Sequence, residues 1–403
     1  MMMNKRVSFN DTAIAFSHKT DKELAQAHFI FSLMKFQWLV KIGTKLTPLA
    51  LKWKLPIKGL LRHTIFKIFI GGESLEETKK VLTTLNQYQV KVILDYGAEG
   101  KENEESFTKT CNEFISLIQY AGKQSSAPFI SIKVTGLARF SFLEKLNIII
   151  KQHPFTLPNP KALTPAEQQE LELLLNKITA IVEAAKQEHI GVLVDAEETW
   201  IQDTIDALTF HFAKLYNQQN AVIFNTIQFY RTAAFDLLQE SIRLAQEHQF
   251  IVGIKMVRGA YMEKERLRAQ EYDYTSPIHA TKQVTDDAFN KGLAYAIANL
   301  EKIHLIIASH NEESNSYATE LLAQYGFAQQ HPHIHFSQLY GMSDHITFNL
   351  AKAGYATSKY LPYGPIDDVV PYLMRRAEEN TSVAGQTSRE LQLIEQEIKR
   401  RKS

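Results

Sequence analysis

The sequence predicts an α/β protein built as a (β/α)8 barrel of the TIM type, preceded by a helical N-terminal segment. From about residue 90 onward, short apolar runs rich in β-branched residues alternate with longer segments of helical period, as expected for a parallel sheet covered by helices. Eight such runs occur within about 290 residues, which fits a closed barrel better than an open doubly wound sheet. No Gly-x-Gly-x-x-Gly follows the first run, so a Rossmann nucleotide-binding unit has no support.

The candidate strands cover residues 90–97, 129–136, 190–197, 221–228, 250–261, 303–311, 333–341 and 355–364. Helices are expected to begin near Glu104, Thr199, Tyr230, Thr281, Glu312, Ser343 and Ile366. One more helix start is well marked, because Thr164 is a suitable N-cap, Pro165 suits the first turn and Glu167 completes a capping box. The last residues, GQTSRELQLIEQEIKRRKS, predict a charged, solvated helix.

Length and composition predict a folded protein with one large domain and appended segments. The chain has 403 residues, of which 45% are hydrophobic and 22% are charged. The expected division is a helical segment at 1–85, the catalytic barrel at 86–384 and a terminal helix at 385–403. No cleaved targeting segment is expected, because the first residues lack both a long apolar run and an Arg-rich, acid-poor pattern.

Several classes of partner are disfavoured by composition. The formal net charge of +1 gives no electrostatic argument for nucleic acid. Cys111 is the single cysteine, so neither a disulfide framework nor a Cys-rich zinc pattern is present, and a reducing, cytoplasmic location is expected. His331, His333 and His335 alternate along a strand without nearby acids, and no metal site is expected there.

The segment 29–72 has a local basic and amphipathic character. Aromatic and aliphatic residues are interleaved with seven lysines and one arginine, and no acid occurs in the segment. No stretch has the roughly 20 uncharged residues that span a bilayer. Two interpretations remain: helices that pack on the main domain with solvated lysines, or a peripheral contact with a membrane.

Polar residues gather where the candidate strands end, which is the edge that carries the site in barrels of this kind. The set is Asp95 with Glu99, Lys133, Asp195, Gln228, Lys255 with Arg258 and Tyr261, and Ser309 with His310 and Asn311. Each alone has a structural explanation, such as helix capping or a hydrogen-bonded core histidine. Their recurrence at six consecutive strand ends points to a ligand, because inward-facing charges are costly unless they bind one another or a ligand.

Two adjacent arginines follow the last strand. On a helix that begins near Asp367, residues Tyr372, Arg375, Arg376 and Glu379 share one face. Two guanidinium groups can hold a carboxylate. The alternative is pairing of both arginines with Glu379 on a solvated surface, and composition alone favours that alternative.

Five segments closely resemble the proline dehydrogenase family of FAD enzymes: VDAEE at 194–198, IKMVRGAYMEKER at 254–266, ASHN at 308–311, KYLPYG at 359–364 and YLMRRAEEN at 372–380. The resemblance runs in order from about Asp95 to Val383, and it is the ordered set that is specific. Residues 1–85 have no comparable motif. The chain is too short for the fused aldehyde dehydrogenase of bifunctional relatives, so the monofunctional form is expected.

The resemblance implies a distorted (β/α)8 barrel with FAD across the carboxyl ends of the strands and the last helix over the site. Substrate would be held by Lys133, Tyr261, Leu339, Tyr360, Arg375 and Arg376. Asp195 and Lys255 are the implied catalytic residues, Lys255 standing where many relatives have arginine. Asp95, Glu99 and Glu379 would contact these residues without touching the substrate.

For FAD, the resemblance implies contacts from Ala196, Gln228, Lys255, Val257, Arg258, Gly259, Ala260, Thr285, Ser309 and His310. The implied reaction is hydride transfer from L-proline to FAD, giving 1-pyrroline-5-carboxylate, with a membrane quinone as the final electron acceptor. A quinone acceptor would favour peripheral contact of 29–72 with the inner face of the membrane.

Three other functions stay open at this point. Hydroxyproline dehydrogenase is the nearest, although bulky Tyr360 favours proline over its 4-hydroxylated analogue. A flavin-free lyase that uses Lys133 as a Schiff-base amine is the second. A non-catalytic scaffold is the third, and it leaves the inward charges without a purpose.

Overall fold

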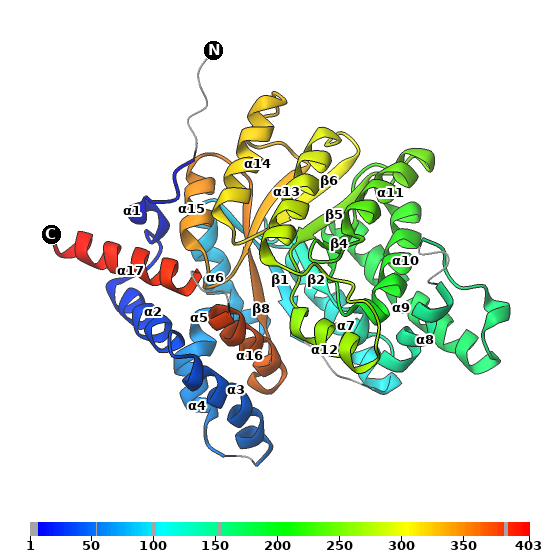
Figure 1. The fold of residues 1–403 in the computed structure, drawn as a ribbon, viewed down its shortest axis with the longest axis horizontal. Helices are drawn as coiled ribbons and strands as arrows, with labels where there is room; N and C mark the ends of the chain where they lie inside the picture. The colour runs from blue at the N-terminus through cyan, green and yellow to red at the C-terminus, as the bar shows by residue number, and fades with distance from the viewer. Residues whose placement is uncertain (1–6, 54, 98–101, 151–154, 383–385) are drawn as a thin grey trace. The chain divides into compact units, whose positions relative to one another are not determined.

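The protein is an eight-stranded parallel barrel, as a computed structural model shows for residues 7–53, 55–97, 102–150, 155–382 and 386–403. The strands close in sequence order, β1 to β8, with helices between them (Figure 1). The predicted (β/α)8 barrel is therefore confirmed. The chain forms two compact units: unit 1 holds the described residues between 99 and 336, and unit 2 holds those between 5 and 98 and from 337 onward.

Unit 1 contains five strands in continuous parallel register and the helices between them. Its strands are β2 (Phe129–Ile132), β3 (Gly191–Val194), β4 (Ile223–Gln228), β5 (Val252–Val257) and β6 (Ile303–Ala308). Its helices are α7 (Glu104–Gly122), η2 (Val134–Gly136), α8 (Phe140–Ile150), η3 (Pro160–Ala162), α9 (Pro165–Glu188), α10 (Thr199–Tyr216), α11 (Ala234–Glu247), α12 (Met262–Glu271), α13 (Lys282–Ala298) and α14 (Glu312–Gln324). The strands are almost wholly buried, as parallel strands covered by helices must be.

Unit 2 contains the N-terminal helices, the paired strands β1 and β8, and the C-terminal helices. The N-terminal part comprises α1 (Thr12–Ala15), α2 (Asp21–Met34), α3 (Gln37–Lys52), α4 (Lys58–Leu61), η1 (Arg62–Phe66), α5 (Lys67–Phe69), α6 (Leu75–Gln87) and β1 (Val90–Tyr96). The C-terminal part comprises α15 (Asp344–Lys352), β8 (Thr357–Tyr363), α16 (Ile366–Ser382) and α17 (Gln386–Lys402). Strand β7 (Ile334–Leu339) spans the boundary between the two units.

The start of α9 confirms the capping prediction. The Thr164 side chain accepts from the backbone N–H of Glu167, and the Glu167 carboxylate accepts in return from the backbone N–H of Thr164 at 3.0 Å. Pro165 fills the first helical position, where no amide hydrogen is needed. The same helix meets α7 through Cys111, whose buried Sγ lies 3.7 Å from the carbonyl oxygen of Lys177.

The C-terminal helix α17 differs from the prediction of a solvated helix. Leu391, Leu393 and Ile394 are buried in a core that also contains residues of α2, α5 and α16. Glu390 and Glu397 are buried as well. The expectation of a solvated helix was wrong because the buried face of α17 includes charged residues, which made it look solvent-exposed in the sequence. The residues that cover this face lie far away in the sequence.

The described residues of the chain include no helix that is both long enough and apolar enough to cross a membrane.

Candidate active site

A buried carboxylate between two lysines lies toward the carboxyl ends of the strands of unit 1. Asp195 follows β3, Lys133 follows β2 and Lys255 lies within β5. The Lys133 ammonium is 3.4 Å from Asp195 Oδ2, and Lys255 forms an ion pair with Asp195 Oδ1. Ser131 also donates to Oδ1, at 2.6 Å. Three residues that the sequence placed at separate strand ends therefore meet in one cluster.

The two lysines keep Asp195 ionised in spite of its burial. Burial opposes ionisation of Asp195, but the charges of Lys255 and Lys133 and the hydrogen bonds outweigh it and hold the pKa of Asp195 well below its usual range. Asp195 is thus a carboxylate at neutral pH. Lys133 and Lys255 thus place two cations at this buried carboxylate.

Glu197 is a second buried acid, two residues beyond Asp195, that was not among the predicted site residues. Its carboxylate accepts from the hydroxyl of Thr135 at 2.6 Å and from the Thr135 N–H at 3.2 Å. Burial raises the pKa of Glu197 to about 7, although Lys133 and the Thr135 hydrogen bonds act in the opposite direction. The repeated acids of VDAEE were the signal in the sequence.

Glu197 also connects to the end of β4 through its main chain. The side-chain amide of Gln228 donates to the Glu197 carbonyl oxygen at 2.8 Å. Gln228 pairs in register with Val257 at the end of β5, and the N–H of Phe229 donates to the Val257 carbonyl at 2.8 Å. Two residues predicted to contact FAD therefore lie on adjacent strand ends.

Arg258 organises the edge beside β6. Its guanidinium group donates to Asp286 Oδ1 at 2.6 Å, to Ser309 Oγ at 2.7 Å and to Ser314 Oγ at 2.9 Å, and it stacks over Phe289. Asp286 was not predicted from the sequence. It lies next to Thr285 on α13. Because Arg258 belongs to VRGAY and Ser309 to ASHN, the hydrogen bond between them joins two predicted segments of the site.

Gly259 occupies a backbone conformation that favours glycine. Its φ angle is +133°, and a Cβ at this position would lie 2.5 Å from the ring of Tyr230. The Arg258 carbonyl accepts from the Tyr230 N–H at 2.7 Å, which fixes this turn. The chain around Gly259 and Ala260 is exposed, so its backbone is accessible to a ligand.

The remaining predicted residues of unit 1 also border these strand ends. Ala196 and Thr285 are buried. His310 is half-buried and follows Ser309 directly after β6. Tyr261 is buried just before α12, with the ammonium of Lys264 5.5 Å from its ring centroid.

Unit 2 holds the other predicted site residues. Asp95 is buried at the end of β1 and pairs in register with Pro362 of β8. Tyr360 of β8 pairs with Ile93, and its carbonyl accepts from the N–H of Tyr340, one residue after Leu339. Leu339 and Tyr360 are both half-buried and pack against the same apolar core.

The paired arginines lie on α16, as predicted. Arg376 is buried and its guanidinium carbon lies 5.2 Å from the ring centroid of Tyr372, while Arg375 is half-buried. Pro371 is the sixth residue of this helix and lies beyond its first turn, so the first-turn position expected from the sequence is wrong and the helix lacks the i→i−4 hydrogen bond there. Glu99 lies outside the described residues, and so does the side chain of Glu379; their predicted roles stay predictions.

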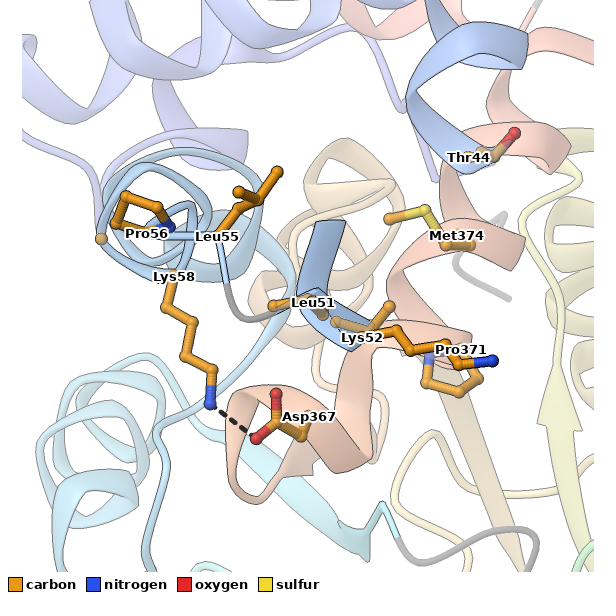
Figure 2. Close-up of a pocket in the computed structure, with 11 residues that line it drawn as sticks. Thr44, Leu51, Lys52, Leu55, Pro56, Lys58, Asp367, Pro371 and Met374 are labelled. Atoms are coloured by element: carbon orange, nitrogen blue, oxygen red, sulfur yellow. Dashed lines mark hydrogen bonds and ion pairs between the residues drawn. The ribbon is translucent and has the colours of Figure 1, made fainter. Parts of the chain in front are cut away.

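A separate hollow lies on the opposite face of α16, within unit 2. It has a volume of about 1080 Å³, and Figure 2 shows the residues that line it. Leu51, Leu55, Val370 and Met374 contribute apolar surface. Lys58 forms an ion pair with Asp367 at 2.6 Å, which joins α4 to the first turn of α16.

The comparisons with known proteins agree on one family. The model of the family described as proline dehydrogenase matches residues 78–389. Proline dehydrogenase 1, mitochondrial, of Dictyostelium discoideum is 31% identical, over 97% of this chain and 74% of its own length. A hydroxyproline dehydrogenase of Xenopus laevis is 29% identical, over 98% of this chain and 90% of its own length.

A solved structure of similar fold is proline utilization A (PutA) from Bdellovibrio bacteriovorus, inactivated by N-propargylglycine. The TM-score is 0.72 at 19% identity, over 94% of this chain. This chain spans 42% of that protein's length. At this identity the likeness concerns the fold.

Proposed function

Because the chain belongs to the proline dehydrogenase family, we propose that it oxidises L-proline to 1-pyrroline-5-carboxylate with FAD as the hydride acceptor. The observation that carries the proposal is the buried cluster of Lys133, Asp195 and Lys255 toward the carboxyl ends of the strands of unit 1. The two lysine cations at this edge suit a carboxylate substrate and a cofactor that becomes more negative during the reaction.

The residues present fit FAD by their chemistry. Arg258, Ser309 and His310 offer donors suited to a pyrophosphate, and the backbone at Gly259 is free of a side chain that would block close approach. Gln228, Val257, Ala196, Ala260 and Thr285 complete the proposed FAD contacts. When bound, FAD supplies the hydride acceptor.

The chain's own residues would bind and orient proline. Lys133 would hold the carboxylate together with Arg375 and Arg376, while Tyr261, Leu339 and Tyr360 would surround the ring. A substrate held by its carboxylate keeps its reacting carbon in one orientation, and this pre-organisation lowers the barrier. The Lys255 cation would offset the negative charge that arrives with the hydride.

Two alternative functions, a Schiff-base lyase and a hydroxyproline dehydrogenase, can be weighed against proline oxidation. A Schiff-base lyase needs Lys133 as a free amine, but its ammonium group is held against the ionised Asp195. Hydroxyproline dehydrogenase keeps support from the Xenopus relative. The bulk of Tyr360 favours proline, and a comparison of kcat/KM for the two substrates decides between them.

The electron acceptor is proposed to be a membrane quinone, reached through peripheral contact of the segment 29–72. Large apolar side chains are exposed there: Trp53 is 70% exposed, Leu60 67% and Trp38 61%. The segment contains no acid. Exposed aromatic residues among lysines are typical of helices that lie in the surface of an anionic bilayer.

The proposed function is tested by the absorbance spectrum of the purified protein before and after anaerobic addition of L-proline. A flavin spectrum that bleaches is the expected result. A flavin that stays oxidised with proline but bleaches with 4-hydroxyproline would favour the alternative substrate. A colourless protein that takes up no added FAD and is trapped by borohydride would contradict the proposal.

A further inference from the structure

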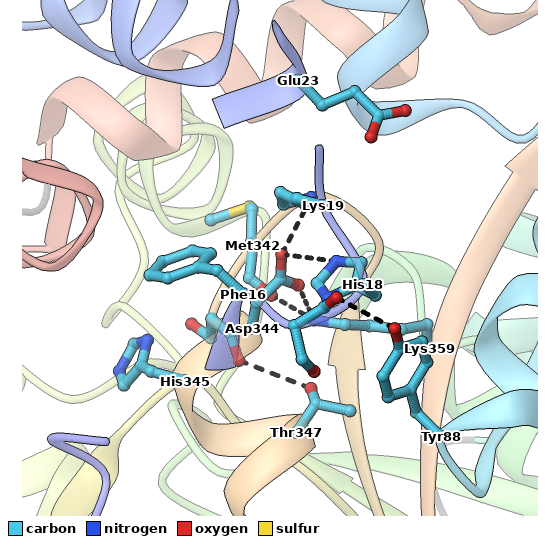
Figure 3. A network of polar contacts seen from close by, with 12 residues as sticks. Phe16, His18, Lys19, Glu23, Tyr88, Met342, Asp344, His345, Thr347 and Lys359 are labelled. Atoms are coloured by element: carbon cyan, nitrogen blue, oxygen red, sulfur yellow. Dashed lines mark hydrogen bonds and ion pairs between the residues drawn. The ribbon is translucent and has the colours of Figure 1, made fainter. Parts of the chain in front are cut away.

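A network of buried charges in unit 2 joins three segments of the chain (Figure 3). Asp344, at the start of α15, is 2% exposed, and Lys359, in β8, is 1% exposed. Their side chains form an ion pair at 2.8 Å. The second carboxylate oxygen of Asp344 lies 3.1 Å from the ammonium of Lys19 and 3.4 Å from Nε2 of His18. His18 and Lys19 of the N-terminal segment therefore share one buried cluster of charges with β8 and α15.

Lys359 uses its ammonium group to hold the loop after β7. Besides Asp344, it donates to the carbonyl oxygens of Met342 at 2.5 Å and Leu339 at 3.4 Å. An ammonium group has three hydrogens, and these three acceptors match them. The residue next to Lys359 is Tyr360, so one buried lysine holds the main chain at Leu339 and is the chain neighbour of Tyr360, two of the three residues proposed to surround the ring.

The loop after β7 packs closely against other parts of unit 2. Gly341 has φ +78°, and a Cβ there would lie 2.2 Å from the carbonyl oxygen of Ile68. Ser343 also has a positive φ, of 51°, and its N–H donates to the buried carboxylate of Glu390 on α17 at 3.0 Å. The loop is thus fixed by contacts from both terminal parts of the chain.

The turn that carries His18 and Lys19 is held by the same C-terminal helix. Arg401 of α17 donates to the carbonyl oxygens of Phe16 and Lys19, both at 2.9 Å. The His18 ring stacks on Phe348 of α15, with centroids 4.0 Å apart. Removing one partner of such a set leaves a buried charge uncompensated, so neighbouring groups must move.

We propose that Lys359, Asp344 and Lys19 are positioning residues for substrate, which hold the Leu339 main chain and Tyr360 against the ring of the bound amino acid. The inference rests on the proposed function. It gives the N-terminal segment a role in selectivity for the ring, exerted through the buried ion pairs with Asp344.

Two substitutions test the proposal, with kcat/KM measured for L-proline and for 4-hydroxyproline using a soluble dye as acceptor. Lys359→Met removes the centre of the network, and Lys19→Met removes its outer cation and serves if the first variant does not fold. For Lys19→Met we expect kcat/KM for proline to fall about tenfold, because displacements near 1 Å reduce rates by up to about 100-fold. The ratio of the two substrates should change by about threefold or more, since the ring wall sets it.

Lys19→Arg should restore the ratio, because it returns a cation to Asp344. Lys352→Met is the matched control, since Lys352 is exposed on the same helix as Asp344. A folded Lys19→Met protein with an unchanged ratio of substrates would overturn the positioning role. A wild-type flavin that neither substrate reduces would instead contradict the proposed function, so the two failures are distinguishable.

Discussion

Asp195 and Glu197 lie two residues apart after the same strand, yet their environments move their protonation in opposite directions. Asp195 faces two lysines, and Glu197 faces the hydroxyl and amide of Thr135. Burial disfavours the charged form of both acids, and only the closer cations at Asp195 reverse it. The number of adjacent ammonium groups therefore decides which of the two acids is fully ionised at neutral pH.

Glu197 should make stability depend on pH between about 4.5 and 7. Its pKa is about 7 in the folded protein and lower when unfolded, so the stability contributed by the protonated form is complete below pH 4.5 and lost as pH rises through 7. Glu197→Gln should remove this dependence and stabilise the protein above pH 8 by about 3 kcal/mol at most. Urea unfolding across this range measures it. The same curve for Glu301→Gln, at an exposed position, should match wild type.

Arg258→Lys should weaken FAD binding although it keeps the charge. Arg258 donates to three separate side chains, and a lysine cannot reach all of them from one point charge. The expected change in Kd for FAD is about tenfold, the value of about one lost hydrogen bond to a charged group. Flavin fluorescence on dilution measures release. Arg243→Lys, on the exposed face of α11, is the control, and equal release from both variants would contradict the assignment.

At the scale of elements, period and capping chemistry predicted most of the fold. The eight strands and the start of α9 follow from alternation and from Thr164, Pro165 and Glu167. The burial of α17 was not predicted, because the face that it buries contains Glu390 and Glu397. Glu390 accepts a hydrogen bond from a residue distant in the sequence, and Glu397 is paired with Arg401. For the same reason the candidate site was predicted only as residues at strand ends, whereas Glu197 and Asp286 join it through hydrogen bonds that only the fold brings together.

Leu393→Ala should destabilise the protein by about 2–5 kcal/mol, because Leu393 is fully buried in the core under α17 and the substitution leaves a cavity. Denaturant unfolding followed by circular dichroism measures this. Leu173→Ala on α9 removes the same atoms from a side chain that is 38% exposed, and it should cost less than about 1 kcal/mol. Similar values for both variants would mean that α17 does not pack as described.

At the scale of the molecule, charge is balanced overall but not locally. The net charge is +1, yet 29–72 has cations and no acid. A surface of this composition attracts anionic lipid without making the whole protein basic. The proposed chemistry and the proposed membrane contact therefore belong to different regions of the chain.

Replacing Lys35, Lys41 and Lys52 together by Glu should reduce binding to vesicles that contain phosphatidylglycerol by about 100-fold or more, at about 1 kcal/mol for each lysine near the surface. Co-sedimentation measures binding, and added salt should weaken the wild-type interaction. The same change at exposed Lys80, Lys123 and Lys302 keeps the net charge equal and should have a smaller effect. Equal losses would indicate attraction by net charge alone.

The thiol of Cys111 provides a built-in reporter of one unit only. It is buried between α7 and α9 in unit 1, and unit 2 contains no cysteine. A reagent can therefore label the protein only after unit 1 opens, and the labelling rate gives the free energy of that opening when reclosing is fast. Two of the three tryptophans, Trp38 and Trp53, belong to unit 2 and the third, Trp200, belongs to unit 1, so in a Trp200→Phe variant the fluorescence follows unit 2 alone. Running both signals through one denaturant titration would show whether the halves melt as a single cooperative body.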